Sequence, residues 1–120
     1  MAYRFKKQKT PITVREYKYN NNTELLNEYL IEDISFETEE GHLYVTIEGK
    51  KLFDAGVKDG KDNFIEWALK EPDGEIAKGK INTRDLKQGE TFCLSMERNL
   101  YFEEGEFLFK VLTTEYRNSR

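Results

Sequence analysis

The stretch FIEWALKEPDGEIAKGKIN, residues 64–82, decides the expected fold. Around Trp67, apolar residues alternate with polar or small ones, and this period of two places the apolar side chains on one face of a β-strand. Pro72-Asp73-Gly74 supplies a type I turn followed by glycine, which is typical of a β-hairpin. The return arm, residues 76–81, has few apolar side chains, and its lysines are typical of an edge strand. We therefore expect a hairpin with its tryptophan in the core, where Trp67→Ala costs about 3–5 kcal/mol.

Alternating apolar residues recur on both sides of this hairpin and are separated by polar turns. Further strands are expected at residues 12–19, 34–37, 43–48, 92–96 and 107–116, with the longest loop at residues 53–63. Thr23–Leu30 favours a short helix, because Thr23 can cap it and its leucines share a helical face, although the same residues also fit an extended strand. The pattern predicts an all-β fold, an antiparallel β-sandwich of about seven strands with at most one short helix.

Length and charge define the expected domain organisation. The chain has 120 residues, which fits one domain. Residues 1–10 are expected to be a flexible basic arm, and residues 11–120 a single β-sandwich domain. Residues 1–19 carry a net charge of +5 and the rest of the chain −9. An acidic body repels phosphate, so the charge balance argues against a nucleic-acid partner.

The apolar segments and the N-terminal sequence indicate where in or outside the cell the protein is expected. No run approaches the roughly 20 apolar residues of a membrane-spanning helix, so no membrane partner is expected. The N-terminus lacks the apolar segment of a secretory signal. We expect a cytoplasmic protein if Met1 is the native start, and an extracellular one if a signal has been removed. A single cysteine, Cys93, excludes an intrachain disulfide, which fits a reducing compartment.

Few residues support catalysis, and the sequence predicts no enzyme, no cofactor and no metal site. His42 and Cys93 have no second soft ligand at a recognisable spacing. Nucleophile elbows and phosphate-binding loops are missing, and the paired glutamates fall at hairpin tips, where water keeps them ionised. The loop at residues 53–63 has oxygen ligands of the kind that calcium takes but no EF-hand pattern, so a solvated loop is the default.

Three motifs resemble a known superfamily. They are W-x-L-x-E-P-D-G-E at residues 67–75, D-L-x-x-G-E at residues 85–90 and G-E-F-x-F-x-V at residues 105–111. Over residues 31–116 they resemble the strand pattern of immunoglobulin-like and fibronectin type III-like β-sandwiches, including bacterial accessory and adhesion modules. The resemblance implies an immunoglobulin-like fold, and no functional residue carries over with it.

In that superfamily one more strand usually follows the last motif. Its absence implies that the sheet edge beside Phe107–Tyr116 needs a cover. Ile12–Tyr19 can fold over this edge in cis, which we favour, or a neighbouring chain can donate a strand in trans.

The expected function is that of a non-enzymatic protein-interaction or structural module. It binds a macromolecular partner through a sheet edge, its loops or the N-terminal arm, or self-associates through an edge strand. The candidate partner-binding residues are the aromatic residues Tyr17, Tyr19, Tyr44, Tyr101 and Phe102. One alternative is a carbohydrate-binding module of a secreted protein, in which the first three form an aromatic strip if their strands are adjacent. Another is a small phage-type inhibitor or accessory protein that binds through its acidic face. In the simplest alternative, these rings only pack under loops.

Overall fold

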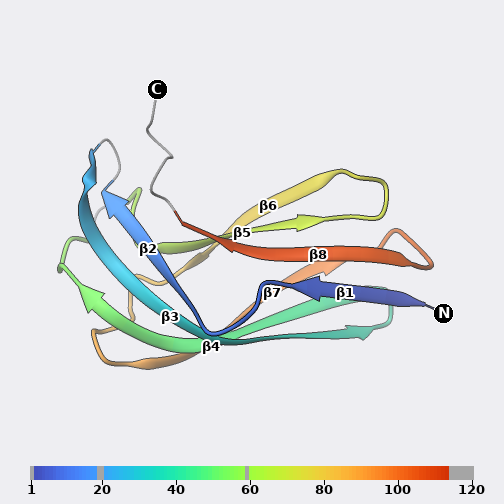
Figure 1. Cartoon of the computed structure of the whole chain (residues 1–120), viewed down its shortest axis with the longest axis horizontal. Helices are drawn as coiled ribbons and strands as arrows, with labels where there is room; N and C mark the ends of the chain where they lie inside the picture. The colour runs from blue at the N-terminus through green and yellow to red at the C-terminus, as the bar shows by residue number, and fades with distance from the viewer. Residues whose placement is uncertain (1, 19–20, 59, 114–120) are drawn as a thin grey trace.

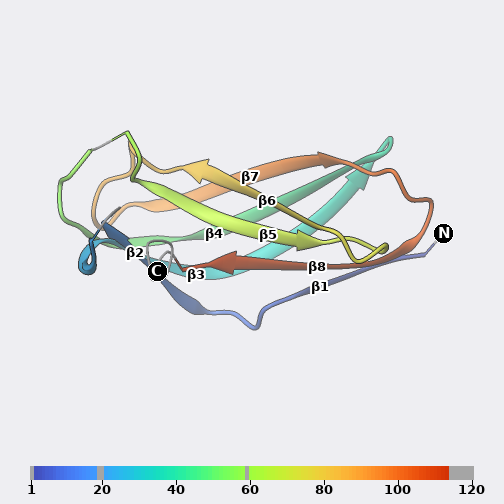
Figure 2. The same ribbon diagram turned by 90° about the horizontal axis from the view of Figure 1, so that it is seen from above.

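The computed structural model describes residues 2–18, 21–58 and 60–113, and within them the chain is all-β. In these residues there are eight strands and no helix, and the strands form two four-stranded sheets (Figure 1, Figure 2). The strands are β1 (Tyr3–Lys7), β2 (Ile12–Lys18), β3 (Asn21–Glu39), β4 (His42–Asp54), β5 (Phe64–Lys70), β6 (Ile76–Asn82), β7 (Thr91–Asn99) and β8 (Gly105–Leu112). One sheet has the order β1-β8-β5-β6 and the other β2-β3-β4-β7. The predicted all-β class is confirmed, with one strand more than expected.

Both sheets contribute to a single apolar core. Trp67 on β5 is only 8% exposed, and its ring lies 6.1 Å from that of Phe109 on β8. The indole also lies against Gly79 of β6, where a Cβ atom would come within 2.3 Å of the ring. Only a residue without a side chain allows this contact. The prediction that Trp67 is a core residue is therefore confirmed.

The predicted hairpins form at the predicted turns. Between β3 and β4, Glu40 and Gly41 have φ angles of 50° and 81°, the backbone of a two-residue hairpin loop with both φ angles positive. Between β5 and β6, the amide of Gly74 donates to the Glu71 carbonyl at 2.8 Å. The return strand β6 lies at a sheet edge, as its composition indicates.

The expectation of a helix at Thr23–Leu30 is wrong, and the extended alternative is confirmed. These residues lie in β3, where β2 pairs with one side and β4 with the other. Both neighbours satisfy backbone groups that a helix would satisfy internally, and Tyr29 is buried in the apolar core. Tertiary pairing thus overrides a weak local preference. The strand has register shifts, one of them between Ile31 and Asp33.

The N-terminal segment corrects two further expectations. Tyr3–Lys7, inside the segment expected to be a flexible arm, form β1 and pair with β8. The reason is their alternation, because Tyr3 and Phe5 turn toward the core while their neighbours face outward. β2 lies in the opposite sheet, so the expectation that residues 12–19 cover the edge of the last strand is wrong. The edge is covered in cis, but by β1 (Figure 1).

Candidate functional site

The edge of β8 forms a slot that β1 fills. The two strands are parallel, with Tyr3 opposite Gly105 at one end and Lys7 opposite Phe109 at the other. The Phe5 ring enters between the sheets, with its centroid 5.1 Å from that of Phe36 and 5.3 Å from that of Phe107. The slot therefore accepts an extended segment whose apolar side chains are two residues apart.

Side chains extend the β1 ladder past its last residue. The Gln8 amide donates to the Val111 carbonyl at 3.2 Å and accepts from the Val111 amide at 2.9 Å. The Gln8 side chain thereby makes the pair of hydrogen bonds to Val111 that a strand backbone would otherwise make. Lys7 reaches across to the other sheet and donates to the Ile34 carbonyl. These contacts fix the register of β1 without adding much buried apolar area.

A closed polar network lies beside the loops at the other end of the sandwich. Glu16 of β2 is 1% exposed, and its carboxylate accepts from the Asn63 amide at 2.6 Å, the Asn27 side chain at 2.9 Å and the Phe64 amide at 3.2 Å. The Tyr29 hydroxyl also contacts Glu16, and burial together with that carboxylate raises the pKa of Tyr29. This buried network joins β2, β3 and the start of β5, and one of its buried atoms, Asn27 Oδ1, has no hydrogen-bond partner among the described residues.

A second buried charge lies nearby. The Lys51 ammonium, fully buried, donates to Asp54 at 3.0 Å and to the Leu86 carbonyl at 3.1 Å. Burial alone would raise the pKa of Asp54, but hydrogen bonds from Lys51, the Gly56 amide and Lys58 outweigh it and lower that pKa to about 2. Asp54 is one of the oxygen ligands of the kind that calcium takes in the loop at residues 53–63, and two lysines engage it here. Asp59, another such candidate, lies outside the described residues.

The predicted partner-binding residues fall in separate places. Tyr17 on β2 lies opposite Leu25, whereas Tyr44 on β4 lies opposite Glu37, so β3 separates them across the sheet and along it. Tyr19 lies outside the described residues. The structure therefore does not bring Tyr17 and Tyr44 together in an aromatic strip.

Tyr101 and Phe102 are neighbours in the loop before β8, but their environments differ. Tyr101 is 74% exposed. Phe102 packs edge-on against Phe107, with the ring centroids 6.2 Å apart, and its carbonyl accepts from the Tyr3 hydroxyl. Phe102 thus belongs to the support of β1, whereas the Tyr101 ring is accessible to a partner.

Tyr44 lies in the middle of an acidic sheet face. Cross-strand register places Glu37 on one side of it and Glu97 on the other. Partial burial and these carboxylates, with Glu97 the largest electrostatic contributor, raise the pKa of Tyr44. Glu39, Asp33 and Glu48 share this outer face through the same alternation.

The outer face of the other sheet has the opposite charge. Register and alternation place on it the basic residues Arg4, Lys6, Lys70, Lys78, Lys80 and Lys110, and the acidic residues Glu66 and Glu106. We call this surface the basic face. Sequence reasoning missed it, because its residues come from four strands whose order the sequence does not disclose. The only local signal was a lysine at alternate positions of β6.

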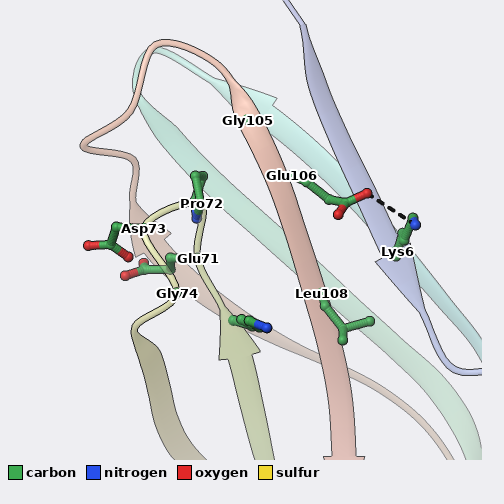
Figure 3. Close-up of a pocket in the computed structure, with 9 residues that line it drawn as sticks. Lys6, Glu71, Pro72, Asp73, Gly74, Gly105, Glu106 and Leu108 are labelled. Atoms are coloured by element: carbon green, nitrogen blue, oxygen red, sulfur yellow. Dashed lines mark ion pairs between the residues drawn. The ribbon is translucent and has the colours of Figure 1, made fainter.

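A pocket opens where the basic face meets the β5–β6 turn. It has a volume of about 630 Å³ and lies between Pro72-Asp73-Gly74, the start of β8 and Lys6 (Figure 3). The Lys6 ammonium lies 3.1 Å from the Glu106 carboxylate, and Glu71 is engaged by Arg98 of β7 at 2.6 Å. Lys6, Glu106 and Glu71 are thus paired within the protein, and Lys70 and Asp73 are the charged lining residues outside these pairs.

Residues suited to catalysis do not converge. His42 lies opposite Asn99 of β7, whereas Cys93 lies opposite Glu48, six residues further along β4. At about 3.4 Å per residue, His42 and Cys93 are separated by roughly 20 Å. Within the described residues, no group of three or more His, Cys, Asp or Glu side chains is placed to hold a metal ion.

Fold and surfaces together define an all-β, two-sheet domain with a filled edge slot and two oppositely charged outer faces. None of the described residues forms a helix that could span a membrane. Comparisons with known protein families, curated proteins and solved structures found no match.

Proposed function

We propose that this domain is a non-enzymatic protein-interaction module that binds its partner by strand exchange at the edge of β8. The observation that carries the proposal is β1 itself. A five-residue edge strand pairs in parallel with β8 and inserts alternating aromatic side chains between the sheets. Among the described strands, β1 pairs only with β8, so it can leave its slot without disturbing the order of the other strands.

The attachment of β1 is weak enough to exchange. Full burial of an aromatic side chain stabilises by about 1.5–3 kcal/mol, and Tyr3 and Phe5 are only partly buried. Parallel pairs are also slightly less stable per residue than antiparallel ones. The outward residues of β1 add surface ion pairs such as Lys6–Glu106, which contribute about 0–1 kcal/mol each.

The strand order supports an immunoglobulin-like topology, which we include in the proposal. Neighbours β3-β4-β7 follow the A-B-E order of such sandwiches, and β6-β5-β8 follow the order C′-C-F. Trp67 then lies on the C strand, where the fold places a buried tryptophan. In this scheme β1 lies beside the F strand, where the G strand lies in such sandwiches, but it runs parallel to β8 rather than antiparallel.

The slot requires an extended partner segment with apolar side chains at alternate positions. The β1 strand of a second copy of this chain meets this requirement, because β1 already fits the slot in cis. An exchanged β1 makes the same contacts in trans as in cis, which is the low-cost route of domain swapping. The proposed assembly is therefore a dimer of this chain, joined through the strand slot.

A cross-linking experiment on the full chain tests the exchange. Arg4 and Glu106 are register partners, so cysteines at these positions are close enough for a disulfide. In a Cys93→Ser background, Arg4→Cys and Glu106→Cys chains are mixed, incubated at high concentration and oxidised. We expect a disulfide-linked heterodimer on a non-reducing gel.

Two controls make the result decisive. The double variant with both cysteines in one chain reports closure in cis. Mixing Arg4→Cys with Lys110→Cys places the cysteines out of register and is expected to give no heterodimer. If the double variant closes while the in-register mixture stays monomeric, β1 does not exchange and the proposal fails.

A second candidate function is carbohydrate binding at Tyr44. The observation that favours it is a half-buried tyrosine on a sheet face with carboxylates directly across on both sides. Affinity gels containing neutral and acidic polysaccharides test it. Retardation that Tyr44→Ala abolishes and Tyr101→Ala preserves would support this site, whereas unchanged mobility on all gels would remove it.

A further inference from the structure

The basic face concentrates positive charge on an otherwise acidic protein. The chain has a net charge of −4, yet this face carries six basic and two acidic side chains. Within residues 2–18, 21–58 and 60–113, Lys6 is the only one of the six with an ion-pair partner. Glu66 lies opposite Lys80 and Glu106 opposite Arg4, so the positive charge without a facing carboxylate is that of Lys70, Lys78 and Lys110.

The centre of the basic face brings like charges close together. Lys78 of β6 and Lys110 of β8 lie on either side of Ala68, in the same cross-strand row. Their Cα atoms are about 10 Å apart, because adjacent strands lie 4.7–4.9 Å apart. Lys70 is the next outward residue on β5. An anion placed above Ala68 is therefore attracted by all three lysines.

The acidic side of the molecule does not cancel this attraction. At physiological ionic strength, charges are screened over about 8 Å. Even the shortest principal extent of the molecule is 24 Å. An anion at the basic face therefore responds to the lysines in front of it more than to the carboxylates behind it. The expectation that the acidic body repels phosphate thus does not hold for this face.

The side chains that lie between the basic residues favour a lipid surface over a nucleic acid as the partner of the basic face. The basic residues spread in two dimensions over four strands, with the aliphatic side chains of Leu108, Leu112 and Ile76 between them. Ile76 is 57% exposed. Base stacking needs open aromatic rings, but the ring at the matching position, Phe64, is buried and covered by Lys80.

We propose that the basic face binds the surface of a lipid bilayer rich in anionic lipids. Lysines attract the charged headgroups, and exposed aliphatic side chains enter the interface between them. This binding needs no spanning segment, so it is compatible with the lack of one in the sequence. It goes beyond the strand-exchange function, which uses the edge of β8 rather than its outer side.

The probe is a set of vesicles of phosphatidylcholine with and without phosphatidylserine, sedimented with the full chain at low and at physiological salt. We expect binding only to the anionic vesicles, weakening as salt rises. Each basic side chain near an anionic bilayer raises the binding constant about fivefold. Lys78→Glu combined with Lys110→Glu should therefore weaken binding at least about 25-fold.

A matched control has the same change in net charge elsewhere. Lys50 lies on β4 and Lys87 in a loop, both exposed, so Lys50→Glu with Lys87→Glu should leave binding within about twofold. Ile76→Ser changes no charge and should weaken binding severalfold. Equal loss in both charge-reversal pairs would overturn the proposal, because binding would then follow net charge alone. Retention of the chain by duplex DNA without binding to anionic vesicles would overturn it in favour of a nucleic acid.

Discussion

The two ends of this sandwich are closed in opposite ways. Beside the loops, the carboxylate of Glu16 on β2, which is 1% exposed, gathers hydrogen bonds from β3 and from the start of β5. At the edge of β8, partly exposed aromatic side chains from β1 close the gap between the sheets. Both ends join segments that are distant in sequence, but the first does so through a buried charge, and the second through backbone pairs and apolar contacts that an equivalent strand can replace.

This difference separates a fixed part of the molecule from an exchangeable one. When β1 leaves its slot, the apolar packing of Tyr3 and Phe5 is restored as soon as an equivalent strand enters. When a hydrogen bond to Glu16 breaks, a buried donor is left without an acceptor, at about 1–3 kcal/mol each. Interaction through the β8 edge is therefore physically easier than any rearrangement at the Glu16 end.

The largest expected effect comes from removing the carboxylate. We expect Glu16→Ala to lower the free energy of unfolding by about 3–5 kcal/mol, because the amides of Asn63 and Phe64 and the Asn27 side chain lose a buried acceptor. Urea unfolding measures it. Arg15→Ala is the matched control, since Arg15 makes only a surface ion pair with Glu28, and it should cost at most about 1 kcal/mol. Equal costs for the two variants would show that the network does not lock this end.

The Gly79→Ala variant tests the contact between Gly79 and Trp67, which lies between the two ends of the sandwich. The added methyl group would lie 2.3 Å from the Trp67 ring, so the indole or β6 must move. We expect a loss of about 2–3 kcal/mol in the free energy of unfolding and a change in tryptophan fluorescence. Gly60→Ala, with open space around its Cβ position, is the control. A Gly79→Ala loss below about 0.5 kcal/mol would mean that the indole is loosely held.

The sequence disclosed features that depend on near neighbours. The hairpin around Trp67, the turn at Glu40-Gly41 and the edge position of β6 follow from alternation and turn chemistry within a few residues. The helix expected at residues 23–30 failed because β2 and β4 decide the conformation of that segment.

The candidate sites depend on distant pairings, which alternation does not reveal. β1 has a visible pattern at Tyr3 and Phe5, but nothing local connects it to β8, whose first residue is Gly105. Glu16 is inward-facing in the same alternation as Val14, a conflict that could have marked it as a buried polar residue. The two charged faces emerge only once the register of both sheets is known. Among the predicted aromatic residues, Tyr44 and Tyr101 remain candidates for partner binding.

Acid should weaken the loop end of the molecule through Asp54. The pKa of Asp54 falls from 3.8 to about 2 on folding, so its ionised form stabilises the fold above about pH 4, and that stability is lost as pH falls toward 2. The contribution is about 2 kcal/mol at neutral pH. Urea unfolding from pH 7 to pH 2 measures it. The Asp54→Asn variant, whose residue 54 cannot titrate, should lose less free energy of unfolding between pH 7 and pH 2. If the variant and the original protein lose the same amount, Asp54 does not contribute to the loss of stability in acid.

The smallest expected loss of global stability belongs to Phe5→Ala. Phe5 is partly exposed, so its removal should lower the free energy of unfolding by only about 1 kcal/mol, well below the cost for a fully buried aromatic residue. The local effect should be larger. Hydrogen exchange of the Val111 amide, which donates to Gln8, should accelerate while amides at the Glu16 end stay protected. Arg4→Ala, on the outward side of the same strand, should leave both unchanged. If Phe5→Ala instead destabilised the whole domain as much as Glu16→Ala, β1 would be an integral part of the core, and the contrast between a fixed end and an exchangeable edge would disappear.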